Sequence, residues 1–215
     1  MVQMEIGMKR TANVSALGYA AFAVTLWLAS MGAAGWFDQP GNTLLPLLFE
    51  QPGNALLPLL TAVLGGCVLA LAGIGQYVRG NVLDAILFVA FAGYWWIAAI
   101  EQHVVQISTF APTSAFLGWY YIVWAFLAFC IWLAACSDGV ARMLFTLGLC
   151  ISLLAFALGE WIGLAALTVL GGYLGLVTAI VGIYIAAAEI INEIRGHTVL
   201  PLGESAAANG PTLPG

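Results

Sequence analysis

The stretch at residues 164–190, LAALTVLGGYLGLVTAIVGIYIAAAEI, is apolar along its length and carries its first charge only at Glu189. A helix needs about 20 predominantly apolar residues to cross the hydrocarbon core of a bilayer. Five more runs of this kind lie at 16–36, 56–77, 82–100, 114–136 and 140–158. Their apolar residues are continuous rather than alternating as in a membrane barrel, so the sequence predicts an all-α membrane protein with six transmembrane helices per protomer.

The overall composition supports this fold class. Of the 215 residues, 63% are hydrophobic and 7% are charged, whereas an average soluble domain carries about 25% charged residues. So few charges cannot cover the exterior of a soluble domain of this size. The net charge of -5 and the scattered positions of the five basic residues also argue against a nucleic-acid partner.

The basic residues predict the orientation of the helices. All five fall on one side of the predicted membrane: Lys9 and Arg10 before the first run, Arg79 after the second, Arg142 at the start of the fifth and Arg195 after the sixth. The loops expected on the other side hold acidic residues and neither Lys nor Arg. Because Lys and Arg collect in cytoplasmic loops, we expect both termini in the cytoplasm.

These boundaries divide the chain into three segments. We expect a cytoplasmic N-terminal segment at 1–15, a transmembrane domain at 16–195, and a cytoplasmic tail at 196–215 that is flexible at its end. The transmembrane domain includes an outer loop at 38–55.

That outer loop contains a short tandem repeat. The tetrapeptide QPGN at 39–42 recurs at 51–54, each copy leading into an LLPLL segment. Pro-Gly pairs mark turns, and the period is too short for a solenoid unit. We interpret the repeat as a local duplication with an interfacial LLPLL segment, in preference to a functional lid.

Groups suited to catalysis or metal binding do not converge in the sequence. His103 and His197 fall in predicted loops on opposite sides of the membrane, and the Gly-x-Gly-x-x-Gly, Walker and His-Glu-x-x-His patterns are absent. Four cysteines fall within apolar runs, where we expect small buried hydrophobic side chains: Cys67, Cys130, Cys136 and Cys150. We therefore expect no enzyme, no cofactor and no metal site.

Ionisable residues inside a membrane usually mark coupled transport or voltage sensing. No Lys or Arg lies in the middle of a predicted span, and acidic residues such as Asp84 lie at or near helix ends. The sequence therefore shows no clear proton relay and favours a passive, gated or weakly coupled route for a small solute. Glu189 is the exception, because it lies inside the sixth run with Asn192 on the same helix face; an ion pair with Arg195 is the alternative role.

Several motifs resemble one known family over about residues 13–204. They are GHTVLPLG at 196–203, AEIINE at 188–193, Gly65-Gly66, Arg79-Gly80-Asn81 and Trp95. Together they resemble the acetate uptake transporter family, also called the succinate-acetate permease or YaaH-like family. The family signature Asn-Pro-Ala-Pro-Leu-Gly stands here as NVSALG at 13–18, which keeps the Asn and the Leu-Gly but loses both prolines.

The resemblance implies a channel or transporter for small monocarboxylates, chiefly acetate and also succinate. It implies a six-helix protomer that carries its own pore and assembles as a homohexamer in the prokaryotic cytoplasmic (inner) membrane.

The resemblance also implies roles for individual residues. A hydrophobic constriction is expected at Phe22, Phe91 and Ile151, where Phe91 replaces a family tyrosine and Ile151 a family leucine. The candidates for substrate binding are Asn13, Ser15, Leu17, Gly18, Thr25, Leu69 and Trp95. Leu69 stands at a polar glutamine position of the family, so the path is expected to be drier. From their place in the sixth run, and not from the resemblance, Glu189 and Asn192 are the candidates for a proton or gating role.

Local patterns leave other interpretations open. Asn13 and Ser15 precede the first run, where they could present a helix N-terminus to an anion or merely cap the helix. A dry interior also suits a channel for a small neutral solute such as urea or an amide. The lack of charged pore residues further allows a structural membrane protein that transports nothing.

Overall fold

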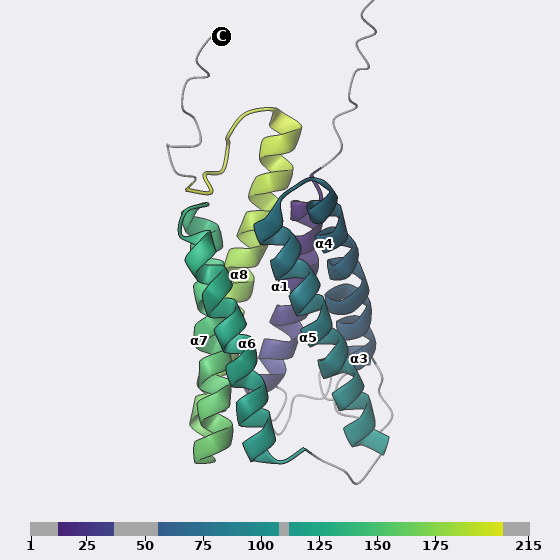
Figure 1. Ribbon diagram of the computed structural model, residues 1–215, viewed down its shortest axis with the longest axis vertical. Coiled ribbons are helices and arrows are strands. Elements are labelled where there is room, and N and C mark those ends of the chain that lie inside the picture. Colours follow the sequence, from purple (N-terminus) through teal and green to yellow (C-terminus); the bar gives the residue numbers. More distant parts are fainter. Residues whose placement is uncertain (1–12, 37–55, 108–111, 204–215) are drawn as a thin grey trace, which may run out of the picture.

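The computed structural model describes residues 13–36, 56–107 and 112–203, and its regular elements there are all helical (Figure 1). Six helical segments are long and apolar enough to cross a membrane, as predicted. In chain order they are α1 (Ser15–Ala33), α3 with η1 and α4 (Leu56–Leu60, Thr61–Val68 and Leu69–Val78), α5 (Val82–Ile107), α6 (Ser114–Ala135), α7 (Val140–Ile162) and α8 (Ala165–Arg195).

Local chemistry sets several of the helix boundaries. The hydroxyl oxygen of Thr113 accepts a 3.3 Å hydrogen bond from the backbone N–H of Phe116 and so caps the start of α6. α7 and α8 end at Gly163 and Gly196, each with a φ of 70°. Glycine adopts this left-handed conformation without a Cβ clash, which stops both helices cleanly.

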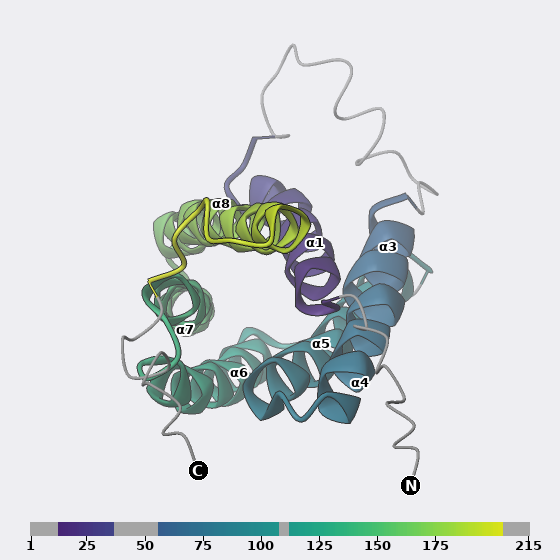
Figure 2. The ribbon, with the colours of Figure 1, turned by 90° about the horizontal axis from the view of Figure 1, so that it is seen from above.

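The six segments surround a common interior when the bundle is seen from above (Figure 2). The start of α1 and the end of α8 lie at the same end of the bundle, here called the termini end (Figure 1). α1 lies beside α8, α8 beside α7, and α7 beside α6, while α4 packs on α5. All six spans contribute buried side chains to one hydrophobic core.

Close packing of α1 on α8 depends on small residues. A Cβ atom added at Gly172 would lie 2.5 Å from the backbone nitrogen of Ala34 and 2.8 Å from the carbonyl carbon of Ala33. Since both neighbours are backbone atoms, they could not rotate away. The two helices therefore approach as closely as they do because residue 172 has no side chain.

The second span is irregular in its middle. Residues Thr61–Val68 form a π-helical segment one turn after Pro58, which cannot donate a backbone hydrogen bond. This segment contains the pair Gly65 and Gly66. A Cβ at Gly65 would meet the ring of Trp95 at 2.6 Å, so the glycine allows that indole to lie against the helix backbone. π-Helical segments are frequent at functional sites.

The structure corrects two expectations about residue environment. His103 lies within α5, which continues beyond the predicted span, and not in a loop. Cys67, Cys130 and Cys136 are exposed on the outer faces of their helices, and only Cys150 is buried. An apolar run that crosses a membrane need not be buried in the protein on every face, because lipid covers its outer side.

Parts of the predicted organisation lie outside the described residues. These parts are the N-terminal residues 1–12, the segment 37–55 with both QPGN copies, and the end of the tail at 204–215. The second LLPLL segment is described, and it forms the helix α3 at the start of the second span. The role of the repeat stays a prediction.

Candidate functional site

Five aromatic side chains fill the middle of the bundle. We call them the aromatic plug: Tyr19, Phe22, Phe88, Phe91 and Phe145. They come from α1, α5 and α7, and none of them is more than 1% exposed. Neighbouring ring centroids lie between 5.0 and 5.4 Å apart, mostly edge to face, which is the favoured geometry for aromatic pairs.

Two of the three expected constriction residues lie in this plug. The rings of Phe22 and Phe91 face each other at 5.2 Å. Ile151 does not join them, because it is 42% exposed on the outer face of α7. An α-helix turns about 100° per residue, so residue 151 lies on the opposite side from Leu149 and Leu153. Those two leucines are buried and line the cavity beside the plug, whereas Ile151 does not line it.

A cavity of about 490 Å³ lies between the plug and the end of the bundle away from the termini. Its walls combine aromatic and aliphatic side chains, and Glu101 and Gln102 also line it. Trp95 and Tyr120 line the cavity, and the indole N–H of Trp95 and the hydroxyl of Tyr120 are buried without a hydrogen-bond partner among the described residues. Buried donors are normally satisfied, so these two are available to a ligand or to water.

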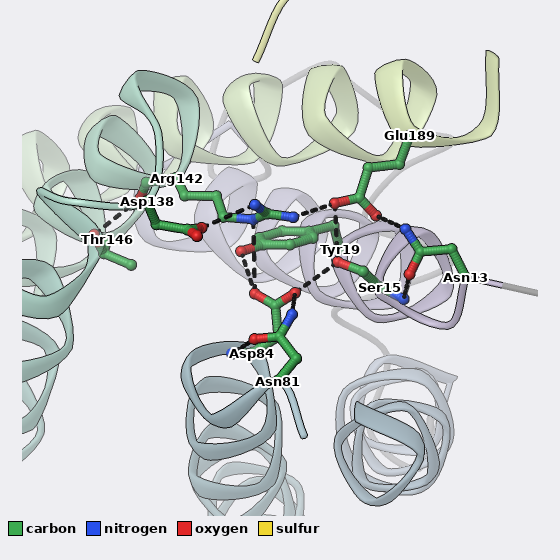
Figure 3. Close-up of polar contacts among 9 residues, drawn as sticks. All are labelled: Asn13, Ser15, Tyr19, Asn81, Asp84, Asp138, Arg142, Thr146 and Glu189. Atoms are coloured by element: carbon green, nitrogen blue, oxygen red, sulfur yellow. Dashed lines mark hydrogen bonds and ion pairs between the residues drawn. The ribbon is translucent and has the colours of Figure 1, made fainter. Parts of the chain in front are cut away.

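An ionic cluster lies on the termini side of the plug, where α1, α5 and α7 begin and α8 nears its end. We define it as Ser15, Tyr19, Asp84, Arg142 and Glu189, and Figure 3 shows its side chains. The guanidinium of Arg142 contacts the carboxylates of Glu189 at 2.5 Å and Asp84 at 3.8 Å. Asp84 is 0% exposed and Glu189 5% exposed. The charges thus lie in the protein interior, where partners are required to offset the loss of hydration.

Hydroxyl and amide groups complete the bonding of the two acids. Ser15 Oγ lies 2.7 Å from Asp84 and 3.0 Å from Glu189. Tyr19 donates from its hydroxyl to Asp84 at 2.9 Å, and the side-chain amide of Asn81 donates to Asp84 at the same distance. The side-chain amide of Asn13 donates to Glu189 at 3.3 Å (Figure 3). The cluster thereby joins α1, α5, α7 and α8.

A polar pocket of about 620 Å³ opens beside the ionic cluster at the termini end. Arg142 and Glu189 line it together with Asn13, Arg79 and Gln76. Gln76 is 1% exposed, and its amide nitrogen is buried without a hydrogen-bond partner among the described residues. The bundle therefore holds a cavity and a pocket on opposite sides of one aromatic plug.

The remaining predicted binding residues lie in different surroundings. Leu17 is half exposed on α1, whereas Gly18 packs against the ring of Phe88. Thr25 is buried and donates its hydroxyl proton to the carbonyl of Ala21 in its own helix. Leu69 is fully buried in the hydrophobic core. None of these four lines the cavity or the pocket, while Asn13 and Trp95 each line one of them.

Asn192 holds the start of the C-terminal tail. Its side-chain oxygen accepts hydrogen bonds from the N–H groups of Val199 and Leu200, and its amide donates to the carbonyl of Leu200. The tail then pairs with the start of α7 through the Val140 N–H to the carbonyl of Gly203. Asn192 thus shapes the rim of the polar pocket through the tail.

Sequence reasoning missed the ionic cluster. Glu189 binds Arg142 in α7 and not the nearby Arg195, and Asp84 joins the same guanidinium from α5. The sequence did contain a signal, because all three residues fall at span ends on the same predicted side of the membrane. The sequence does not reveal which spans are neighbours, so the charges could not be paired from spacing alone.

The fold and this site define a polytopic membrane protein whose bundle holds two hollows separated by buried aromatic rings. The chain belongs to the GPR1/FUN34/yaaH family, whose pattern matches residues 50–203. This match confirms the family resemblance inferred from the motifs. With six helices of membrane-spanning type, the chain is an integral membrane protein.

Individual relatives match over most of the chain. The succinate-acetate/proton symporter SatP of Escherichia coli K12 is 26% identical over 201 residues, which are 93% of this chain and 100% of that protein. The yeast accumulation of dyads protein 2, from Saccharomyces cerevisiae, is 26% identical over 87% of this chain and 64% of its own length. The solved structure of the bacterial acetate channel SatP superposes with a TM-score of 0.79 at 25% identity, covering 90% of this chain and 100% of that one.

Proposed function

We propose that this chain conducts small monocarboxylates, acetate above all, across a membrane through a path within each protomer. The observation that carries the proposal is the aromatic plug between the cavity and the polar pocket. The relatives named for acetate and for succinate-acetate transport support the choice of a carboxylate and make succinate a second candidate substrate.

The lining suits the two ends of an acetate molecule. A methyl group can pass between aromatic rings at little cost, whereas a carboxylate that leaves water needs hydrogen-bond donors in exchange. Trp95 and Tyr120 offer unpartnered donors on one side of the plug, and Gln76 offers one on the other. The closed rings exclude water, so opening of the plug gates the path.

Orientation and assembly form part of the same proposal. We assign the termini end to the cytoplasm because Arg79, Arg142 and Arg195 lie at that end. We further propose a homohexamer in the prokaryotic cytoplasmic (inner) membrane. The outward face of α6, with Phe116, Phe126 and other exposed apolar side chains, supports a surface covered by lipid or by a neighbouring protomer.

Reconstitution tests the proposed function. The purified full chain in liposomes is expected to raise the flux of labelled acetate above that of protein-free liposomes and of liposomes that carry the boiled protein. Unlabelled succinate should compete, and urea should not. Urea flux without acetate flux would instead favour a channel for neutral solutes. A lack of flux for both would indicate a structural membrane protein.

A further inference from the structure

The hydrogen bonds around Ser15 require one more proton than the side chains carry when both neighbouring acids are ionised. A serine hydroxyl carries a single hydrogen and donates to one acceptor at a time. Its oxygen nevertheless lies within hydrogen-bond distance of two buried carboxylates, at 2.7 Å from Asp84 and 3.0 Å from Glu189. If both acids were ionised, one of these contacts would place two oxygen atoms together without a hydrogen between them. One added proton on either acid completes the chain of hydrogen bonds.

The balance of charge around Arg142 also favours one bound proton. Arg142 is the cation of the ionic cluster and faces both buried acids. With both acids ionised, these three residues carry one excess negative charge in the protein interior, and one bound proton removes it. An uncompensated interior charge is costly, so this charge count agrees with the extra proton that the hydrogen bonds around Ser15 require.

A second feature shows that the adjoining pocket is suited to a bound anion. The amide nitrogen of Gln76 is a donor without a partner, and the residue is 1% exposed in the wall of the polar pocket. The Nε of Arg142 faces Asp84 at 3.8 Å, which is beyond hydrogen-bond distance. Gln76, Arg142 and Glu189 line the same pocket, so a carboxylate there could contact the guanidinium that Glu189 now holds.

We propose that Asp84 and Glu189 bind one exchangeable proton between them, bridged by Ser15, and that this proton releases Arg142 to a substrate carboxylate. The proton comes from water in the polar pocket and adds to one carboxylate oxygen, without any other bond being made or broken. The neutral acid then holds the guanidinium less strongly, so a carboxylate anion can take its place. The part that concerns the substrate rests on the proposed function, whereas the proton site does not.

Other ionisable groups around the pair act on the same equilibrium. Asp138 contacts Arg142 from the other side at 2.8 Å, and Tyr19 donates to Asp84. Arg79, Glu193 and His197 line the polar pocket. Asp138 and Glu193 are exposed, so the buried pair remains the position where a proton removes an interior charge.

Infrared spectroscopy of the purified full chain tests the proton site without any transport. A protonated carboxyl group has a C=O stretching band that an ionised carboxylate lacks. We expect a component of this band that titrates with pH in the wild type and is lost in the double variant Asp84→Asn/Glu189→Gln, beside the components of the other acids. It should persist in Glu160→Gln, a matched change outside the cavity and the pocket. A band unaffected by the double substitution, or no titrating band, would overturn the proton site.

A milder variant keeps the test decisive if the double variant fails to fold. Ser15→Ala removes only the bridging hydroxyl and retains the backbone N–H that Ser15 donates to Asn13. Loss of one hydrogen bond to a charged group should change proton affinity by about tenfold. The band is therefore expected to titrate about one pH unit away from its wild-type midpoint. An unchanged midpoint would contradict the bridge.

Calorimetry separates the coupling from the proposed function. Acetate is titrated into the protein in buffers of different ionisation heat, which reports the protons taken up per acetate bound. We expect on the order of one proton in the wild type and Glu160→Gln, and close to none in Glu189→Gln. Acetate binding without proton uptake in the wild type would refute the coupling. Absence of both acetate binding and acetate flux would refute the proposed function while the infrared result stands.

Discussion

The hydroxyl of Tyr19 donates a 2.9 Å hydrogen bond to the buried carboxylate of Asp84, while the ring of Tyr19 packs at 5.4 Å on that of Phe145. One residue therefore belongs to both the ionic cluster and the aromatic plug. Phe145 lies three positions after Arg142 on α7, so it shares a helix face with the cation of the cluster. A change of charge in the cluster is thus positioned to alter the packing of the plug.

Removal of the Tyr19 hydroxyl should weaken the connection between the ionic cluster and the aromatic plug. Tyr19→Phe keeps the ring contacts and deletes one hydrogen bond to a charged acceptor, so we expect a loss of about 1.5–3 kcal/mol of stability. Thermal unfolding of the detergent-solubilised protein measures it. Tyr77→Phe is a matched control on the exposed face of α4. Equal unfolding temperatures for Tyr19→Phe and the wild type would contradict a structural role for this bond.

Arg142 should be far more important for stability than its exposed partner Asp138. Arg142→Gln leaves two buried carboxylates without their cation, and breaking a buried pair in this way costs about 3–5 kcal/mol. Asp138→Asn disturbs a pair whose acid is 41% exposed, so about 1 kcal/mol or less is expected. Thermal unfolding followed by circular dichroism compares them. Similar losses for the two variants would argue against the buried cluster as a structural element.

Phe91 should control the passage through the plug. Phe91→Tyr adds a hydroxyl that can donate to a passing carboxylate, so we expect faster acetate flux into liposomes. Phe91→Ala should widen the passage and admit larger acids, although loss of a buried ring costs about 3–5 kcal/mol of stability. Acetate and butyrate fluxes are compared at equal amounts of folded protein. Unchanged flux in Phe91→Tyr would remove Phe91 from the constriction.

Leu149 and Ile151 provide a paired test of the third constriction position. Leu149→Ala shortens a buried side chain that lines the cavity, so it should increase acetate flux several-fold in liposomes, on the order of 1 kcal/mol in the barrier. Ile151→Ala changes an outward-facing side chain and should leave the flux at its wild-type value. The reverse pattern would restore Ile151 to the path and exclude Leu149.

Gly172 should be intolerant of any side chain. A Cβ there meets backbone atoms of Ala34 at 2.5 Å and of Ala33 at 2.8 Å, so Gly172→Ala forces α1 and α8 apart. We expect a loss of about 1–3 kcal/mol, as for other overpacking substitutions. Gly93→Ala is the matched control, because nothing lies within 4 Å of the added atom. Unfolding temperatures of the two variants measure the difference, and equal values would disprove the tight contact.

The number of helices and their extents could be predicted from the sequence because both depend on local hydrophobicity and length. The predicted fifth run at 140–158 corresponds to α7, which continues to Ile162. The third run was predicted to end at 100, before the charge of Glu101, whereas α5 continues to Ile107. Hydrophobicity marks the membrane core, but backbone hydrogen bonding carries a helix beyond it.

Which helices are neighbours, and which faces they turn inward, were decided only by the tertiary structure. Asp84, Arg142 and Glu189 are far apart in the chain, and their charges pair because α5, α7 and α8 meet at one end of the bundle. Ile151 and Leu149 are equally apolar, and helix rotation alone places one outside and the other against the cavity. In a membrane both faces of a helix can be apolar, so the sequence carries little information about rotation, and packing decides it.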